Sequence, residues 1–322
     1  MRSIVYIIGV RGRTGAMFNH ELSPVAKIIG VDKGADFGAL LKRDWPDFIW
    51  LATRNPVSEP VKSYYSFLKG KENIPTLILS QNGLSAVDDA QVALKEVLGQ
   101  AAEKVRIIRI SLCNQVEIDE TNKELGIKYK LPIMLGFGPS TSSGQTLSTR
   151  ASTELSRRFS KQVVDDVEQI FKAAGFKTQK FFGKGVRDME YSKLFSNLIG
   201  MAAAVNGKTV NEGLRDKTIF IQEIMMLKEL AAVAKAEHVS FTDLGNYPVR
   251  FGAFIIKLPI WLLLMSRGLL VALVEKKRAG KPKDLSEIDY YNGEVVKLGK
   301  KFGIPTPINE KIVEEAKRIE IR

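Results

Sequence analysis

The sequence predicts an α/β protein, with a doubly wound sheet in its N-terminal part and a domain made only of helices after it. Apolar runs of strand length alternate with helical segments up to about residue 185, which is the pattern of strands joined by crossover helices. Beyond that residue the apolar spacing is helical, and no strand is predicted. We therefore predict two domains, residues 1–184 and 185–322.

Each element of the first domain follows from its apolar pattern. Residues 3–9 form a continuous apolar run, as expected for a strand buried on both faces. A glycine-rich turn and a helix over 14–22 come next, and 156–176 is a helix that stops at Gly175. Residues 138–150 are polar and are predicted to form a loop. Further strands are predicted at 26–32, 47–53, 75–80, 104–112, 131–137 and 177–183.

The composition excludes several classes of protein. The chain has 322 residues, of which 45% are hydrophobic and 26% charged, as in an ordinary globular protein. Its net charge of +12 is scattered beside acidic residues without a basic arm, so no nucleic-acid partner is predicted. The single cysteine, Cys113, excludes an internal disulfide and fits a reducing cytoplasm. With only His20 and His238, no histidine-rich metal site is predicted, and proton transfer falls to a lysine or a carboxylate.

The apolar segment 254–273 raises the question of a membrane span, because it has the right length. Lys257, Pro259 and Arg267 interrupt it, so no membrane partner is predicted. A buried core helix, or an exposed apolar face that forms a homodimer, is the preferred interpretation. Residues 3–9 are apolar but too short for a signal peptide.

A glycine triplet, Gly9, Gly12 and Gly15, lies between the first strand and its helix. Glycines at such a turn let a pyrophosphate approach the backbone amides of the helix N-terminus. The strand–turn–helix context predicts a Rossmann-like dinucleotide site, and a tight turn without a ligand is the alternative. The same turn contains three further candidates for this site, Arg11, Arg13 and Thr14.

Polar side chains follow three more strands. Asp32 and Lys33 end the second strand, where an acid accepts the ribose hydroxyls of NAD and a base accommodates the extra phosphate of NADP. Because both are present, these residues leave the choice of cofactor open. Arg54 follows the third strand, and Asn82, in the sequence QNG, follows the fourth. Ligands of open α/β sheets bind beyond such strand ends, although Asn-Gly is also a common turn.

In the helical domain, Lys193 and Asn197 are spaced to share one face of a helix that is otherwise apolar or small. Burying a charged lysine costs free energy unless the lysine is paired, or unless its pKa is lowered so that it can give up and take back a proton. A lysine that extends its amine to solvent, beside an unrelated amide, is the alternative. Further on, Ser286 is predicted to cap a helix with Glu287 in its first turn, and this carboxylate is a candidate partner for Lys193.

These segments, in this order, resemble those of the ketopantoate reductase (2-dehydropantoate 2-reductase) family. The shared features are the N-terminal glycine turn, QNG after a strand, a lysine-x-x-x-asparagine helix and the late segment SEIDYYNG at 286–293. The similarity spans nearly the whole chain and is strongest at 75–84, 165–214 and 280–310. The resemblance implies a Rossmann-like domain followed by a helical domain that binds substrate and forms a homodimer.

The resemblance also implies a reaction, the reduction of a small 2-keto acid with a nicotinamide cofactor. The foremost substrate is 2-dehydropantoate, which gives (R)-pantoate for pantothenate and coenzyme A synthesis. In such reductases the lysine that matches Lys193 is the general acid, and Glu287 would hold this lysine or the ribose region, so both are catalytic candidates. Asn82 and Asn197 would position the substrate, with Asn82 and Glu287 also at the cofactor. The resemblance favours NADP(H) as the cofactor, with NAD(H) as the alternative. Three residues match family positions more loosely: Arg54 near the cofactor phosphate, and Asn211 and Ser266 on the substrate side.

The chain departs from the family pattern in four places, one of which is a longer region between Gly280 and Glu287. Its glycine turn has one more residue than the usual G-x-G-x-x-G, and Met201 occupies the place of a second asparagine. The serine that binds the substrate carboxylate has no clear counterpart, because Ser266 fits only with a shift. Two alternatives follow from these departures: a related dehydrogenase of another 2-oxo or 2-hydroxy acid, or a nucleotide-binding module without catalysis.

Overall fold

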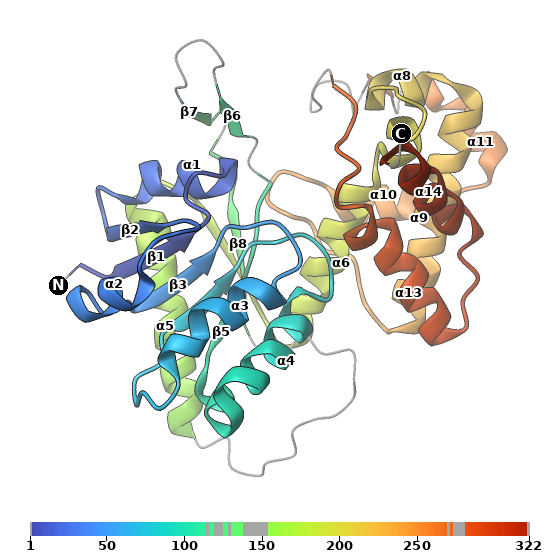
Figure 1. Ribbon diagram of the computed structural model, residues 1–322. Helices are drawn as coiled ribbons and strands as arrows, with labels where there is room; N and C mark the ends of the chain where they lie inside the picture. Colours follow the sequence, from blue (N-terminus) through green and yellow to red (C-terminus); the bar gives the residue numbers. More distant parts are fainter. Residues whose placement is uncertain are drawn as a thin grey trace. The chain divides into compact units, whose positions relative to one another are not determined.

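The chain divides into two compact units in the computed structural model (Figure 1). The first comprises Met1–Gln81 and Ser85–Arg187, and the second comprises Asn82–Leu84 and Asp188–Arg322. The predicted boundary at 184/185 falls at the start of helix α6 (Lys184–Leu198). The structure describes residues 2–113, 116–118, 125–127, 130–137, 154–268, 271–272 and 281–320, so the predicted loop at 138–150 lies outside it.

The first unit is built on a seven-stranded sheet with the strand order β2-β1-β3-β4-β5-β8-β9. The first five strands of this order are mutually parallel, whereas β8 is antiparallel to β5 and parallel to β9. The chain order reverses at β1, which makes the carboxyl ends of β1 and β3 the expected ligand position of a doubly wound sheet. The strands are β1 (Ile4–Ile8), β2 (Lys27–Val31), β3 (Phe48–Leu51), β4 (Thr76–Leu79), β5 (Ile107–Ser111), β8 (Ile133–Phe137) and β9 (Thr178–Phe182).

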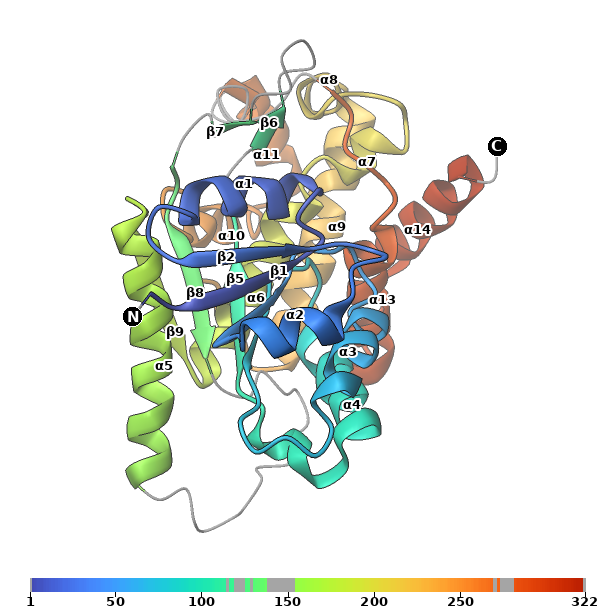
Figure 2. The same cartoon turned by 60° about the vertical axis from the view of Figure 1, so that its left-hand side comes forward.

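Helices cover both faces of this sheet, because successive residues of each strand point to opposite faces. Ile49 of β3 packs in one core with side chains of α2, α3 and α4, and the next residue, Trp50, packs in a second core with α1 and α5. Figure 2 shows α5 on one side of the sheet and α2, α3 and α4 on the other. The helical elements of this unit are α1 (Arg13–Leu22), α2 (Phe37–Arg43), α3 (Ser58–Tyr65), η1 (Ser66–Leu68), α4 (Ala86–Leu98), η2 (Gly99–Lys104) and α5 (Glu154–Ala173).

Two details of the first unit differ from the sequence prediction. A small antiparallel sheet of β6 (Val116–Ile118) and β7 (Leu125–Ile127) was not predicted, since three-residue strands are too short to show a period. The predicted strand 104–112 is shorter, because 3-10 turn η2 extends to Lys104 and β5 begins only at Ile107.

The second unit contains helices and no β-strand among its described residues. Helix α9 contacts α7, α8, α11, α13 and α14. The carboxylate of Glu229 on α9 accepts hydrogen bonds from Ile308 N (2.9 Å) and Asn309 N (3.0 Å), which caps the N-terminus of α14. The elements are α6, α7 (Met201–Ala204), α8 (Val210–Arg215), α9 (Lys217–Ala236), α10 (Val249–Ile255), α11 (Ile260–Met265), η3 (Ile288–Tyr290), α13 (Asn292–Phe302) and α14 (Pro307–Glu320). A doubly wound α/β domain followed by a helical domain is therefore confirmed.

The apolar segment at 254–273 forms separate short helices in its described part, because Pro259 lacks an amide hydrogen and α11 begins after it. Leu263 is buried, whereas Phe254, Trp261 and Met265 are exposed. Of the helices that the structure describes, none has both the length and the apolar character to cross a bilayer.

Candidate active site

The first candidate site is the glycine turn between β1 and α1. Gly9 has a φ of +82°, its amide donates to Val31 O at 2.8 Å, and its carbonyl accepts from Gly12 N at 3.0 Å. A Cβ at Gly15 would lie 2.2 Å from Gly9 O and 2.8 Å from Val10 Cα, a distance that folded chains do not tolerate. Glycine is needed at positions 9 and 15 because the turn folds back against the helix that it opens.

This turn offers hydrogen-bond donors and positive charge to an anion. Helix α1 begins at Arg13, after Gly12, which has no side chain to cap it, and its first turn contains no acidic residue. The amides of this N-terminus can therefore bind an anionic ligand. Arg11 is 90% exposed, and its Nε lies 3.4 Å from Oδ2 of Asp32. These residues fit a dinucleotide, with the amides and Arg11 for a pyrophosphate and Asp32 for ribose hydroxyls.

The remaining residues predicted for this site belong to the same edge of the sheet. Thr14 is half-buried in the first turn of α1, Lys33 is exposed after β2, and Arg54 is exposed after β3. Strands β2, β1 and β3 are adjacent and parallel, so their carboxyl ends meet at one edge. The topology thus brings these predicted residues to the edge at which the glycine turn lies.

Gln81, which the sequence analysis did not single out, joins the ends of two strands at this edge. Its Nε2 donates to Leu51 O at 2.9 Å and to Thr53 O at 3.1 Å, and its Oε1 accepts from Ser80 N at 3.1 Å. The side chain is buried, so each of these bonds satisfies a group that would otherwise be costly to desolvate. Gln81 therefore fixes the start of the segment that contains Asn82. Its place directly before Asn82 in QNG was the available signal.

The second candidate site lies on α6, where Lys193 and Asn197 are one turn apart. Both side chains are half-buried. Tyr191, Leu194 and Phe195 of the same helix are buried in the second unit. The predicted arrangement, two polar groups on a helix that is otherwise packed, is therefore what the structure has.

A chain of hydrogen bonds joins three predicted residues from distant parts of the sequence. Nδ2 of Asn197 donates to Oδ1 of Asn82 at 3.1 Å, and Nδ2 of Asn82 donates to Oε2 of Glu287 at 2.9 Å. Asn82 and Glu287 are 205 positions apart, yet both belong to the second unit. We call Asn197, Asn82 and Glu287 the amide–carboxylate chain.

Two further residues at this chain were missed by sequence reasoning. The hydroxyl of Tyr291 donates to Oε2 of Glu287 at 2.9 Å. The ammonium of Lys283 donates to the backbone carbonyl of Asn197. Tyr291 could have been found from its spacing of four residues after Glu287, but Lys283 gave no signal beyond being one of several basic residues.

The prediction that Ser286 caps an α-helix is wrong. Glu287 is followed by a single 3-10 turn, η3, and helix α13 begins only at Asn292. The amide of Ser286 instead donates to Oδ1 of Asp284 at 2.9 Å, so an aspartate turn organises this segment.

The end of α6 is shaped by a buried carboxylate. Gly200 has a φ of +96° and separates α6 from α7, which begins at the buried Met201. The carboxylate of Glu223 accepts hydrogen bonds from Gly200 N at 3.0 Å and Ala203 N at 3.3 Å. Burial raises the pKa of Glu223 to about 7, against the opposing effects of these amides and of Lys283.

Glu223 is therefore expected to make stability depend on pH. The unfolded carboxyl has a pKa of 4.5 and the folded one about 7, so the folded state binds more protons between these values. The contribution of Glu223 is complete below pH 4.5 and is lost as the pH rises to about 7. The free energy of unfolding of Glu223→Gln, relative to that of the wild type, should therefore rise by up to roughly 3 kcal/mol as the pH increases through this window. Urea unfolding of both proteins at several pH values measures this.

The control for this prediction is Glu314→Gln, which changes an exposed carboxylate on α14. Its difference from the wild type should vary little over the same window. A difference between wild type and Glu223→Gln that stays constant with pH would contradict the assignment.

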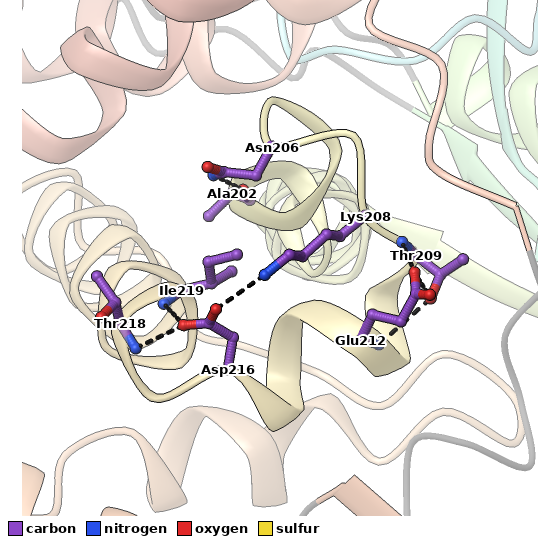
Figure 3. A network of polar contacts seen from close by, with 8 residues as sticks. All are labelled: Ala202, Asn206, Lys208, Thr209, Glu212, Asp216, Thr218 and Ile219. Atoms are coloured by element: carbon purple, nitrogen blue, oxygen red, sulfur yellow. Dashed lines mark hydrogen bonds and ion pairs between the residues drawn. The ribbon is translucent and has the colours of Figure 1, made fainter.

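Two residues predicted to bind substrate, Asn211 and Ser266, make no hydrogen bond to the amide–carboxylate chain among the bonds between described residues. Oδ1 of Asn211, in α8, is buried and has no hydrogen-bond partner among the described residues. Its neighbours in the sequence form a structural network: Thr209 and Glu212 form a capping box, and Lys208 pairs with Asp216 at 2.8 Å (Figure 3). Ser266 directly follows α11, and its Oγ donates to Leu262 O in that helix at 3.1 Å. Their predicted substrate roles stay predictions.

The fold and these two clusters define the class of the protein: a Rossmann-like α/β unit with a glycine-turn site, followed by a helical unit with a lysine and an amide–carboxylate chain. Residues 279–320 match the family model described as ketopantoate reductase PanE/ApbA C terminal. This segment contains Glu287, Tyr291 and helices α13 and α14. This match, together with the shared fold, supports the resemblance to the ketopantoate reductase family that the sequence predicted.

Solved structures share this fold over almost the entire chain. The PanE/ApbA family ketopantoate reductase from Ralstonia eutropha JMP134 is 15% identical, covers 98% of both chains and has a TM-score of 0.66. A D-mandelate dehydrogenase with NADH and anilino(oxo)acetate is 17% identical, covers 98% of this chain and 97% of its own, and has a TM-score of 0.63. A dimeric ketopantoate reductase from Staphylococcus aureus is 14% identical, covers 98% of both chains and has a TM-score of 0.60. A comparison with curated protein sequences found no match.

Proposed function

We propose that this protein is an NAD(P)H-dependent reductase of a small 2-keto acid. The observation that carries the proposal is the amide–carboxylate chain, because it joins Asn82, Asn197 and Glu287, three residues that the family resemblance had assigned to one site. A structural amide on a helix surface would need no such partners from distant segments. The family match at 279–320 supports the same reaction class.

In the proposed reaction, a bound nicotinamide cofactor supplies the hydride, and this chain supplies the proton and the positioning. Lys193 gives its proton to the keto oxygen as charge develops there, and its positive charge stabilises that oxygen. Asn82 and Asn197 orient the substrate, and Glu287 orients Asn82 through the bond at 2.9 Å. Gly9, Gly12 and the amides of the α1 N-terminus hold the pyrophosphate.

For the substrate we propose 2-dehydropantoate, reduced to (R)-pantoate, because the family match lies in the segment that contains Glu287. The second candidate is a related 2-oxo or 2-hydroxy acid. Two observations favour it: a D-mandelate dehydrogenase shares the fold, and Met201 is fully buried where the family commonly has an asparagine. A buried thioether cannot replace the hydrogen bonds of an amide.

We also propose NADP(H) as the favoured cofactor, with NAD(H) as the alternative. Lys33 and Arg54 are exposed beyond β2 and β3 and can accept the additional phosphate. Against this, Asp32 favours ribose hydroxyls, although its ion pair with Arg11 offsets part of its charge.

A homodimer in the cytoplasm is the proposed state. The dimeric relative and the exposed Phe254, Trp261 and Met265 support dimerisation.

A turnover assay tests the proposal. Purified protein with 2-dehydropantoate should oxidise NADPH with a kcat in the usual range of about 1–10³ s⁻¹, followed by absorbance of the reduced nicotinamide. NADH in place of NADPH should give a lower kcat/KM. Turnover of an aromatic 2-keto acid, without turnover of 2-dehydropantoate, would select the second candidate.

Binding of cofactor without turnover of any keto acid in a panel would leave the third interpretation, a nucleotide-binding module without catalysis. NADPH without any keto acid serves as the background control in the same assay.

A further inference from the structure

Tyr291 stands out because it contacts the amide–carboxylate chain and has no role in the reaction proposed above. Its hydroxyl donates to Oε2 of Glu287 at 2.9 Å, the same oxygen that accepts from Nδ2 of Asn82 at 2.9 Å. The residue follows 3-10 turn η3 and directly precedes α13, so the backbone on both sides of it is ordered by secondary structure.

The direction of each hydrogen bond in this chain is set by Glu287. An ionised carboxylate only accepts hydrogen bonds, so Asn82 must present its NH₂ group to it. Oδ1 of Asn82 then faces Asn197, which must donate with its own Nδ2, as observed. The orientation of two amides therefore depends on one carboxylate being held in place.

Both hydrogen bonds that described residues donate to Glu287 fall on Oε2. Two donors on one oxygen of a charged carboxylate fix the position of that oxygen more firmly than one donor does. The same arrangement leaves Oε1 able to accept from a further donor, such as a hydroxyl or ammonium group in the bound state.

We propose that Tyr291 is a positioning residue of the active site: its phenol fixes Glu287, and through Glu287 it fixes the orientation of Asn82 and Asn197. The inference rests on the proposed function for its catalytic consequence. It adds a specific determinant, the phenolic hydroxyl, which phenylalanine lacks while keeping the ring.

The test is Tyr291→Phe, which removes one hydroxyl. Loss of a hydrogen bond to a charged group should lower kcat/KM about tenfold, because Glu287 and the two amides would then be held less firmly in their orientation. In a Glu287→Gln background the same substitution should change kcat/KM less than about twofold, because the charged acceptor is already gone. Equal effects in both backgrounds would overturn the proposal.

The matched control is Tyr191→Phe, which removes a different tyrosine–glutamate hydrogen bond of the second unit, the one from Tyr191 to Glu237. This variant should lower the melting temperature and leave kcat/KM unchanged. A purely structural role for Tyr291 would give the same result as this control.

A second measurement is independent of activity. With protein labelled with ¹⁵N at asparagine, the side-chain NH₂ signals of Asn82 and Asn197 should shift in Tyr291→Phe and stay in place in Tyr191→Phe. If the wild type has no turnover but the two NH₂ signals still shift in Tyr291→Phe, the proposed function is contradicted and the positioning role is supported. Signals that do not respond would overturn the positioning role whether or not the wild type is active.

Discussion

Replacing Lys193 by alanine is expected to lower kcat by about 10²–10⁴-fold, which is the usual contribution of a positioned general acid. The side chain is half-buried on α6, one turn before Asn197, so its removal takes the proposed proton donor away while the amide–carboxylate chain stays. Lys193 is not among the residues proposed to hold the cofactor, and the dissociation constant of the cofactor should therefore change little. Steady-state kinetics and a fluorescence titration of the reduced cofactor measure the two quantities.

The matched control for this prediction is Lys184→Ala, which removes an exposed lysine at the start of the same helix. It should retain wild-type kcat. A Lys193→Ala enzyme with normal turnover would show that the proton comes from another group. Equal losses of cofactor affinity and kcat would indicate that Lys193 mainly supports binding or folding.

Gly15→Ala is expected to destabilise the first unit by about 3 kcal/mol, the upper end of overpacking effects, and to abolish tight cofactor binding. The added Cβ would lie 2.2 Å from Gly9 O and 2.8 Å from Val10 Cα. These are backbone atoms that cannot rotate away, so the turn must open or α1 must shift. Either movement displaces the amides that are proposed to hold the pyrophosphate. Urea unfolding and cofactor titration measure the two effects.

Gly185→Ala is the control, because a Cβ there would meet Phe181 Cδ1 at the ordinary distance of 3.9 Å. Alanine in place of a helical glycine should be neutral or stabilise the protein by up to about 1 kcal/mol. Wild-type stability in Gly15→Ala would mean that the turn is not as closely packed as the structure has it. Normal stability with weaker cofactor binding would separate the binding role of the turn from its role in folding.

Much of the fold was open to prediction, because the signals that specify it are local. The strands predicted at 3–9, 26–32 and 47–53 are rich in apolar residues, and β1, β2 and β3 lie within them. The helix predicted to stop at Gly175 does so, with a φ of +81° at that residue. In contrast, β6 and β7 are too short to show a period, and the turn at Ser286 is organised by Asp284 rather than by a helix cap.

The candidate site was predictable in its residue types and only partly in its geometry. Asn82, Asn197 and Glu287 were assigned from a family resemblance, and the structure joins them by hydrogen bonds. Gln81 and Tyr291 were missed, because their places beside Asn82 and four residues after Glu287 were weak signals on their own. The importance of Gln81 comes from an acceptor on another strand, Leu51 O, and that of Tyr291 comes from the bond that Glu287 makes to the distant Asn82.

The sequence by itself determined the fold class, the glycine turn that opens α1 and the placement of a lysine and an amide on one helix. These follow from apolar periods and turn preferences, which act between residues a few positions apart. Only the tertiary structure decided that Asn82 lies between Asn197 and Glu287, across 115 and 205 positions of sequence. It alone also showed that Tyr291 holds the carboxylate and that Glu223 is buried. The direction of a hydrogen bond and the solvation of a carboxylate depend on what surrounds the group in space, and a linear pattern does not contain that information.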